Sequence, residues 1–376
     1  MSIPRAIIAI LAVFAVFGGA NYYAARRLYQ WLYLLFPNIN IRIYIGIFIF
    51  LALSIILGFL RFPFGIIRFM NVLSAYWMGI FMYLVFFFLI ADVVTLAVHL
   101  IKPETSNIRF YTGLAVILLT CGFTSFGLYN ANQIKTVKYD IQLKDFLLND
   151  MKIVLISDLH LGGVNSEKNL KDMVDSINKV KPDIVCIAGD IFTDDFKLLQ
   201  NPEKAASLFK SIESIYGVYA CLGNHDGGPT LDLMMNFLKE NKIKLLNDEY
   251  VIIDERLALF GRLDSSPIGG SGELKRHNIS TAITSVSKEK PIIVIDHNPA
   301  NIKEYGNETD LILSGHTHYG QIFPGNLMTK MIFTVAYGHY QKDENSPHVI
   351  VSSGAGTWRT PMRVGSKNEV VVVTVK

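Results

Sequence analysis

Residues 311–320 read LILSGHTHYG, a short apolar run followed by a glycine and by two histidines that are one residue apart. The apolar run predicts a buried β-strand. In a regular strand, side chains at positions i and i+2 point to the same face, so His316 and His318 are candidates for binding a common object. A histidine pair alone is weak evidence for a site, because it is equally compatible with two unrelated polar residues in a loop.

Four other segments repeat this pattern of an apolar, β-rich run that ends in polar residues. They are KIVLISDLH, DIVCIAGD, GVYACLGNHD and PIIVIDHNP, at residues 152–160, 183–190, 217–226 and 291–299. Helical patterns at residues 166–180, 203–215 and 231–239 separate them, and further strands are expected at 257–260, 349–352 and 370–375. This alternation predicts an α/β fold with largely parallel, buried strands, in which sites gather at the carboxyl ends of the strands.

The polar residues at these strand ends form a set that suits a metal ion. Taken singly, an aspartate after a strand is usually a helix cap and a histidine is usually a hydrogen-bonded core residue. However, five of the nine histidines of the chain fall in this set. The candidates are Asp158, His160, Asp190, Asn224, His225, His297, His316 and His318. Their imidazole, carboxylate and amide groups suit Mn, Fe or Zn rather than Ca. The glycines that precede Asp190, Asn224 and His316 are expected to permit tight turns at the strand tips.

The first third of the chain has a different composition. Overall, 51% of residues are hydrophobic and only 18% are charged. Residues 1–130 contain eight Lys/Arg and two acidic residues, a local net charge of +6 within a chain of +3. Apolar runs at residues 3–23, 44–60, 72–100 and 111–129 approach or exceed the roughly 20 residues that a membrane-spanning helix needs. The first run is too long for a signal peptide, so we interpret it as an anchor.

The domain prediction follows from this change of composition. An all-α region of four transmembrane helices is expected at residues 1–130, a linker and first strand at 131–150, and an α/β catalytic domain at 151–376. Asp92 and His99 lie seven residues apart in the third apolar run and could share one helix face. They mark either a functional group in the membrane or an interfacial helix end. Arg262, Arg359 and Arg363 are candidates for binding phosphate, with exposure to solvent as the alternative.

The blocks SDLH, AGD, LGNHD, DHNP and SGHTHYGQ, in this order, resemble the signature of the calcineurin-like metallophosphoesterase superfamily. The segments SGHTHYGQIFP and SSGAGTWRTPMRVG are similar to the bacterial branch typified by YkuE and YaeI, some of whose members are membrane-tethered. The resemblance covers residues 151–376. It implies a two-sheet α-β-β-α sandwich with a binuclear metal centre between the sheet edges.

The resemblance also implies a role for each candidate residue. Asp158, His160 and His318 would hold one metal ion, and Asn224, His297 and His316 the other. Asp190 would bridge the two ions. His225 would face the substrate and hydrogen-bond the leaving group, with Asp194 or Asp226 as its orienting partner. The two divalent ions are expected to be manganese, with iron or zinc as alternatives.

These features together predict a membrane-anchored hydrolase. It would cleave a phosphomonoester, phosphodiester or pyrophosphate bond by attack of a metal-bridging hydroxide. Anchoring in the lipid bilayer favours a lipid-linked phosphate ester as substrate, and the acidic balance of residues 131–376 argues against a nucleic acid. The alternative is a membrane sensor or transporter whose phosphoesterase-like domain binds phosphate without hydrolysis.

The predicted location is the cell membrane, with several spans. Lys and Arg divide evenly between the two sides of the four predicted spans, so the positive-inside rule does not decide the orientation. Exported relatives favour the extracytoplasmic side for the catalytic domain. The sequence gives no indication of the oligomeric state.

Overall fold

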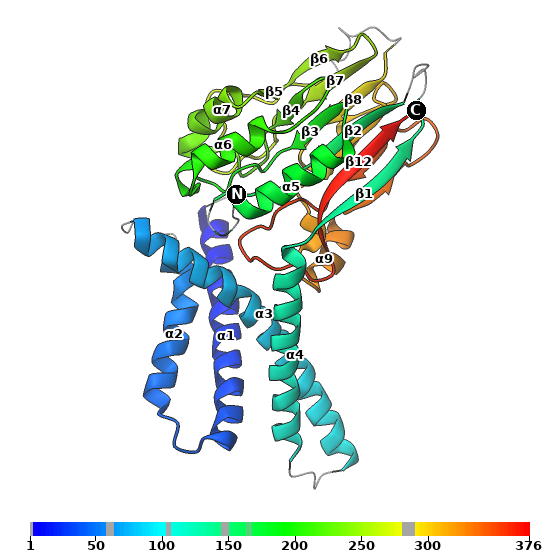
Figure 1. Cartoon of the computed structure of the whole chain (residues 1–376). Coiled ribbons are helices and arrows are strands. Elements are labelled where there is room, and N and C mark those ends of the chain that lie inside the picture. The colour runs from blue at the N-terminus through cyan, green and yellow to red at the C-terminus, as the bar shows by residue number, and fades with distance from the viewer. Residues whose placement is uncertain are drawn as a thin grey trace. The chain divides into compact units, whose positions relative to one another are not determined.

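A computed structural model describes residues 3–57, 64–102, 107–143, 150–162, 164, 167–279 and 290–376. The predicted loop around Glu104, the end of the second apolar run at residues 58–60 and most of the predicted linker after residue 143 lie outside the described residues. The chain divides into two compact units, Met1–Phe126 and Gly127–Lys376 (Figure 1).

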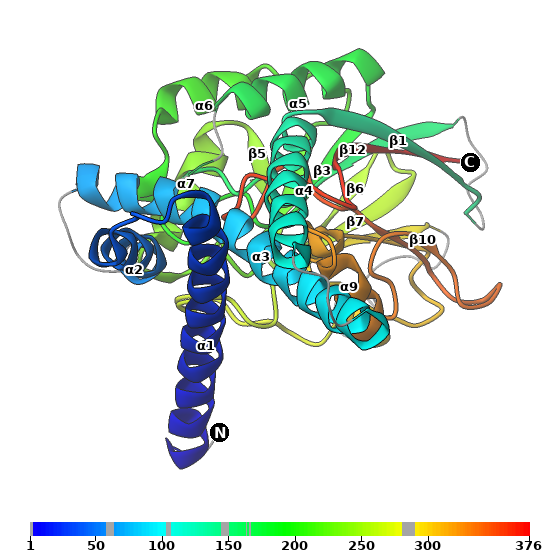
Figure 2. The ribbon, with the colours of Figure 1, turned by 90° about the horizontal axis from the view of Figure 1, so that it is seen from below.

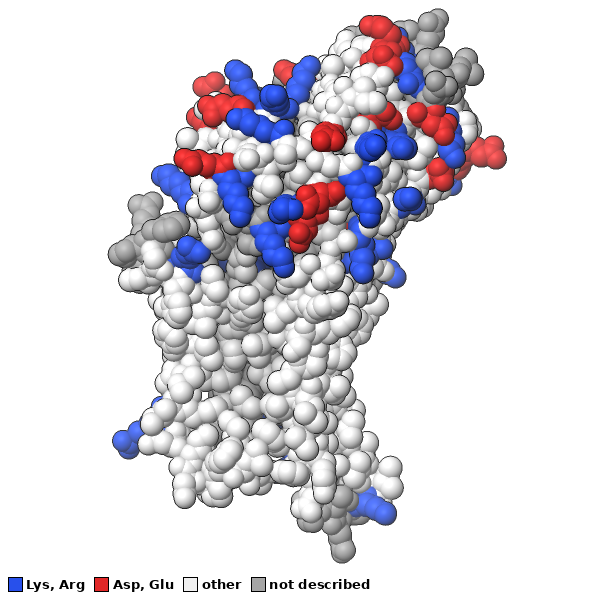
Figure 3. Space-filling model, in the orientation of Figure 1, with Lys and Arg blue, Asp and Glu red and all other residues white. Residues whose placement is uncertain are grey.

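The first unit is all-helical. Its helices are α1 (Ile3–Leu35), α2 (Ile41–Leu57), α3 (Phe64–Ile101) and α4 (Ile108–Ala131), of which α4 continues into the second unit. The surface of these helices carries few charged side chains (Figure 3). Among the described residues, α3 from Gly65 onward and α4 are long and apolar enough to cross a membrane, and α2 is a shorter apolar helix. Length and composition therefore support two spans, where the sequence predicted four.

The charged group predicted in the third apolar run has a partner on another helix. Asp92 of α3 accepts hydrogen bonds from Arg27 of α1, at 2.6 Å, and from the hydroxyl of Tyr23, at 2.8 Å. His99 lies one turn from Thr95, and its Nδ1 is 2.9 Å from the Thr95 carbonyl. Asp92 and His99 both line a cavity of about 530 Å³ between α1, α3 and α4. Asp92 thus forms an ion pair between helices.

The second unit contains two six-stranded sheets, as the predicted sandwich requires (Figure 1). The first has the order β1-β12-β2-β3-β4-β5, and the second β10-β11-β9-β8-β7-β6. The strands of the first sheet are β1 (Ile134–Ile141), β2 (Met151–Ile156), β3 (Ile184–Ala188), β4 (Val218–Cys221), β5 (Ile243–Leu245) and β12 (Asn368–Val375). Those of the second are β6 (Glu249–Ile253), β7 (Leu257–Gly261), β8 (Ile292–Ile295), β9 (Leu311–Ser314), β10 (Gly338–Tyr340) and β11 (His348–Val351).

Both sheets are mixed. The central strands β2, β3 and β4 are parallel, and so are β7, β8, β9 and β11, as predicted from their apolar runs. However, β12 is antiparallel to β2, β6 to β7 and β10 to β11. The parallel strands place the ends of β2, β3 and β4 at one edge of the first sheet, and those of β8 and β9 at one edge of the second.

Besides the end of α4, the α-helices in the described part of this unit are α5 (Glu167–Val180), α6 (Pro202–Lys210), α7 (Leu231–Glu240) and α9 (Gly325–Ile332). The first three cover the outer face of the first sheet, where α5 and α6 lie side by side (Figure 2). The helix predicted at residues 203–215 ends earlier, at Lys210, where Ser211 caps it.

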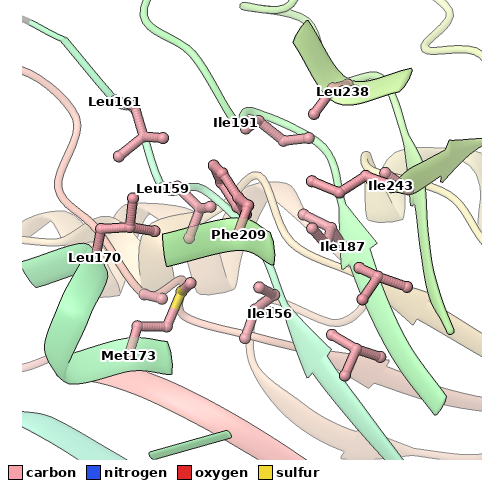
Figure 4. Close-up of a cluster of buried hydrophobic side chains, with 14 of the residues drawn as sticks. Ile156, Leu159, Leu161, Leu170, Met173, Ile187, Ile191, Phe209, Leu238 and Ile243 are labelled. Atoms are coloured by element: carbon pink, nitrogen blue, oxygen red, sulfur yellow. The ribbon is translucent and has the colours of Figure 1, made fainter. Parts of the chain in front are cut away.

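Strand alternation builds the hydrophobic layers. Val154 and Ile156 face α5 and α6, in a cluster that includes Met173 and Phe209 (Figure 4). Their neighbour Leu155 points the opposite way and packs in the layer between the two sheets, because successive strand residues face opposite sides. This arrangement holds the two sheet edges rigidly, which lets their loops form one site.

Candidate metal centre

Every candidate ligand lies in a loop that directly follows a strand. Asp158 and His160 follow β2, Asp190 follows β3, and Asn224 follows β4. From the second sheet, His297 follows β8, and the histidine pair follows β9. Five of these residues have a positive backbone φ: Asp158 (53°), His160 (46°), Asp190 (52°), His316 (70°) and His318 (47°). Such a conformation is uncommon for residues other than glycine and is concentrated at functional sites.

The glycines of these loops act differently from the prediction. Of Gly189, Gly223 and Gly315, which precede Asp190, Asn224 and His316, only Gly189 has a positive φ, of 72°. Gly223 and Gly315 instead provide space: a Cβ atom at Gly223 would lie 2.2 Å from Oδ1 of Asp190, and one at Gly315 would lie 2.4 Å from Oδ2 of Asp158. The ligands themselves make the tight turns, and two of the glycines let carboxylates approach the backbone.

The side chains converge in two groups. In the first, Nε2 of His160 lies 3.0 Å from Nε2 of His318, which lies 3.4 Å from Oδ1 of Asp158. Within this group the donor atoms all lie within 4.8 Å of one another, a geometry that could hold a metal ion.

The second group consists of Asp190, His297 and His316, whose donor atoms also lie within 4.8 Å of one another. Nε2 of His297 is 3.2 Å from Oδ2 of Asp190 and 3.2 Å from Nδ1 of His316. The amide oxygen of Asn224 is 2.8 Å from Nδ1 of His316 and 3.1 Å from Nε2 of His297. Oδ2 of Asp190 is also 3.6 Å from His160 Nε2, so Asp190 lies between the two groups.

Burial makes three of the histidines good neutral ligands. It lowers the pKa of His160 to about 3 and, helped by His297, that of His316 to about 4. Burial and the neighbouring His160 also lower the pKa of His318 well below its usual value. Neutral imidazoles keep their lone pairs at neutral pH, and lone pairs that converge at about 3 Å suit a cation.

Asp190 is more acidic than Asp158, the other carboxyl of the centre, because its pKa is lowered while that of Asp158 is raised. Burial alone would raise its pKa, but the facing His297 and His160 outweigh this effect and lower the pKa below its ordinary value. The same interaction raises the pKa of His297 well above its usual value, although burial opposes this. A carboxylate that holds a proton on a buried imidazole would also attract a cation placed between the two groups. The donor set therefore fits a pair of divalent metal ions.

The family of the chain can now be established by comparison. Residues 151–320 match the family model described as calcineurin-like phosphoesterase. A metallophosphoesterase of Aquifex aeolicus is 31% identical over 232 residues, which cover 60% of this chain and 85% of that protein. The chain belongs to the calcineurin-like metallophosphoesterases. A metallophosphoesterase of Campylobacter jejuni is 29% identical over 375 residues, which make up 97% of each chain.

The metallophosphoesterase is thus, by family, a metal-dependent phosphoric ester hydrolase, as predicted. A protein of Danio rerio named transmembrane protein with metallophosphoesterase domain is 26% identical over 329 residues, which cover 82% of this chain and 74% of that protein. Together with the apolar helices α3 and α4, this likeness indicates membrane association.

His225 lies at the edge of the centre of this metallophosphoesterase. Its ring centroid is 5.0 Å from that of His160, and its Nδ1 is 2.6 Å from Oδ1 of Asp194. Burial lowers the pKa of His225, but the hydrogen bond to Asp194 and the charge of Asp190 outweigh this and raise it. Asp226, the other proposed partner, accepts hydrogen bonds from three backbone N–H groups, those of Ile191, Phe192 and Gly223. Asp194 therefore orients His225, and Asp226 ties together the loops that follow β3 and β4.

Arg262 and Arg363 do not match either interpretation made from the sequence, because both are buried and neither is a surface group. Arg262 pairs with Asp248 at 2.8 Å. Arg363 is 0% exposed and donates to the carbonyl oxygens of His318 and Gly356 and to Oδ1 of Asn368. It holds the backbone of His318, a candidate ligand, and its burial leaves it unavailable to a substrate phosphate. The guanidinium of Arg359, the third candidate, lies 5.9 Å from the ring centroid of Trp358.

Two residues of the site were not identified from the sequence. Trp358 is half-exposed, and its ring centroid lies 5.8 Å from that of His225. Gln321 fixes this segment: its Nε2 donates to the carbonyls of Trp358 and Thr360, and its Oε1 accepts from the Trp358 N–H. The signal for Gln321 was its place directly after the histidine pair, in the block SGHTHYGQ. Nothing in the sequence showed that Trp358 would lie beside His225.

Proposed function

We propose that this protein is a membrane-anchored phosphoesterase that uses two metal ions to hydrolyse a phosphomonoester, phosphodiester or pyrophosphate bond. The observation that carries the proposal is the position of Asp190 where two compact donor groups meet, each of which takes residues from both sheets. One group alone would be compatible with a structural metal ion. Two groups that share a buried carboxylate fit a phosphoryl-transfer centre better, because paired ions can stabilise both the attacking and the leaving oxygen.

Each side chain has a proposed role in this centre. Asp158, His160 and His318 hold one ion, and Asn224, His297 and His316 hold the other. Asp190 bridges the two ions. Divalent ions at these positions would attract the phosphoryl group and supply an activated water as nucleophile. The mixture of nitrogen and oxygen donors suits Mn, with Fe or Zn as alternatives.

His225 is the proposed general acid. Its Nδ1 faces Asp194, which leaves Nε2 available to donate a proton to a leaving-group oxygen. The raised pKa of His225 favours the protonated imidazole that a general acid needs. In the competing sensor or transporter, no residue would need to be maintained as a proton donor beside the centre. The pairing of His225 with Asp194 therefore favours hydrolysis.

The membrane arrangement is also part of the proposal. We place all four helices α1–α4 in the cell membrane, supported by their apolar surface and by the span-like length of α3 and α4. The catalytic unit is proposed to face the extracytoplasmic side. Protease treatment of intact and of broken cells tests this orientation, because an extracytoplasmic unit is cleaved in both and a cytoplasmic one only after lysis.

The experiment that tests the centre combines activity with metal content. Purified protein supplied with Mn²⁺ should hydrolyse aryl phosphate mono- or diesters and contain two metal ions per chain. Asp190→Ala should lose both ions together with activity, because it removes the shared carboxylate. Asp175→Ala, which removes an exposed carboxylate on α5, is the matched control and should retain both. Two ions retained in Asp190→Ala would refute the bridging role, and no hydrolysis of any ester by the natural protein would refute the enzyme.

A further inference from the structure

The helix α9 exposes its apolar side. Leu327, Met328, Met331 and Ile332 lie on one face of this helix and are 51%, 62%, 87% and 70% exposed. A surface helix of a globular protein normally turns such a face towards the core. In the described part of the second unit, other exposed large apolar residues such as Ile215 occur singly in the sequence, and single exposed apolar residues are common on protein surfaces. A contiguous apolar patch instead marks an interaction surface.

This patch adjoins the metal centre. At its start, α9 packs against the turn of the histidine pair so closely that a Cβ atom on Gly320 would lie 2.1 Å from the carbonyl carbon of Gly325. Immediately after α9, the ring of Phe333 lies 5.9 Å, centroid to centroid, from that of His316. Thr317 then donates a hydrogen bond to the carbonyl of Ala336. Both ends of α9 are therefore attached to the loop that carries two of the proposed ligands.

The patch also lies close to the end of α4. The N–H of Phe323, just before α9, donates to the carbonyl of Val364, and the N–H of Arg363 donates to the carbonyl of Gly127 in the last turn of α4. Asn130 of the same turn donates to the carbonyl of Arg363. All these residues belong to the second unit. Two backbone hydrogen bonds, from Phe323 to Val364 and from Arg363 to Gly127, thus connect the start of α9 to the end of α4. The helix α4 is long enough to cross a membrane.

With α4 spanning the membrane, as proposed above, its length puts its last turn at the membrane surface. A helix of 24 residues is about 36 Å long, slightly more than the roughly 30 Å hydrocarbon layer of a bilayer. Tyr129, in this last turn, is exposed, and tyrosine is enriched at the interface between membrane and water. The start of α9 is therefore near the level at which lipid headgroups lie.

We propose that α9 inserts its apolar face into the lipid bilayer and that the metal centre acts on the phosphate groups of membrane lipids. The proposal rests on the hydrolase function above and names its substrate class as amphiphilic phosphate esters. An amphipathic helix at this depth sits about 5–10 Å into the boundary between headgroups and acyl chains. The headgroup phosphate of a neighbouring lipid can then enter the centre while its acyl chains stay in the membrane. The exposed ammonium group of Lys330, on the same helix, complements anionic headgroups.

The first test measures insertion without requiring activity. In the full-length Cys121→Ser protein, whose other two cysteines are buried, Met331→Cys is labelled with an environment-sensitive fluorophore. Ile215→Cys, an exposed apolar position far along the chain, is the control. In vesicles of phosphatidylcholine and phosphatidylglycerol, brominated lipids should quench the label at position 331 and aqueous iodide should quench the label at 215. Equal iodide quenching at both positions would overturn the proposal.

The second test measures substrate use. Replacing Leu327, Met328, Met331 and Ile332 by Gln removes the apolar face but retains helix-forming residues; Ile215→Gln is the control. Hydrolysis of a water-soluble aryl phosphate should stay unchanged, and hydrolysis of phosphatidic acid in vesicles should fall by about tenfold or more. An equal loss on both substrates, or no loss on either, would contradict the proposal. If the natural protein cleaved neither substrate, the hydrolase function would fail, whereas the quenching result would still report on insertion.

Discussion

Replacing Gly315 by alanine should disable the metal centre through a single added methyl group. The Cβ atom would lie 2.4 Å from Oδ2 of Asp158 and 2.4 Å from Oγ of Ser157. Ordinary contacts between such atoms are about 3.5 Å, so the backbone or the carboxylate must move by about 1 Å. Neither neighbour can rotate away freely, because Ser157 and Asp158 are both fully buried.

The displacement would act directly on ligand geometry. The N–H of His316, the next residue, donates to both oxygens of Asp158 at 3.0 Å, so a displaced carboxylate also disturbs this contact. A shift of about 1 Å in a catalytic group can reduce turnover by about 100-fold. We therefore expect Gly315→Ala to lower kcat by about two orders of magnitude, to weaken metal binding in the group that contains Asp158, and to destabilise the unit by about 1–3 kcal/mol through overpacking.

The assay compares turnover of an aryl phosphate, metal ions per chain and the melting temperature. Gly306→Ala is the matched control, because the atom nearest to its added Cβ belongs to the side chain of Glu308, which is exposed and can rotate. The control should behave like the natural protein. Natural turnover and two tightly bound ions in Gly315→Ala would refute the reasoning that Gly315 is needed for the approach of Asp158.

Three further predictions concern the surroundings of the centre. His225→Ala should keep both metal ions but reduce turnover by a factor of about 10²–10⁴, as expected when a general acid is removed. Asp194→Asn should reduce turnover by a smaller factor. Full activity of His225→Ala would eliminate the proposed role of His225. Chelation of the metals should lower the unfolding free energy by about 2.7 kcal/mol for each ion that was present at 100 times its Kd. This loss should appear as a lower melting temperature that Mn²⁺ restores; an unchanged melting temperature would argue against bound ions. Arg363→Met should weaken metal binding by releasing the backbone of His318, although it also removes a positive charge near the site, which by itself would favour a cation. Metal affinity equal to that of the natural protein would show that Arg363 serves stability only.

The strands and the candidate ligands were predictable because their signals are local. An apolar run of four to six residues that ends in Asp, Asn or His identifies a strand and its tip without any knowledge of the fold. The family resemblance was equally local, since each of its blocks spans only a few residues around one strand end. The structure brings the predicted ligand residues together in two adjoining groups.

Features that depend on distant partners were not predictable in the same way. The apolar run of residues 370–375 predicts the strand β12, but its antiparallel pairing with β2 depends on a return of the chain from the far end of the sequence. Arg363 looks like a surface cation by residue type, and only its buried contacts with His318, Gly356 and Asn368 show its structural role. Asp194 and Asp226 were both candidates from the sequence; the contact of Asp194 with His225, and the backbone N–H groups from another loop that Asp226 binds, decide between them.

The sequence by itself determined the fold class, the apolar character of the first unit and the residues at the strand tips, because hydrophobic periodicity and residue chemistry are properties of short segments. The family resemblance assigned His316 and His318 to different ions, but only the tertiary structure shows the backbone geometry that separates them. Their i, i+2 spacing suggested one shared target, but backbone turns with φ of 70° and 47° direct them into different groups. A strand sets the direction of a side chain only while the strand continues, and both histidines lie beyond the end of β9, where packing against the loops of the other sheet determines the geometry.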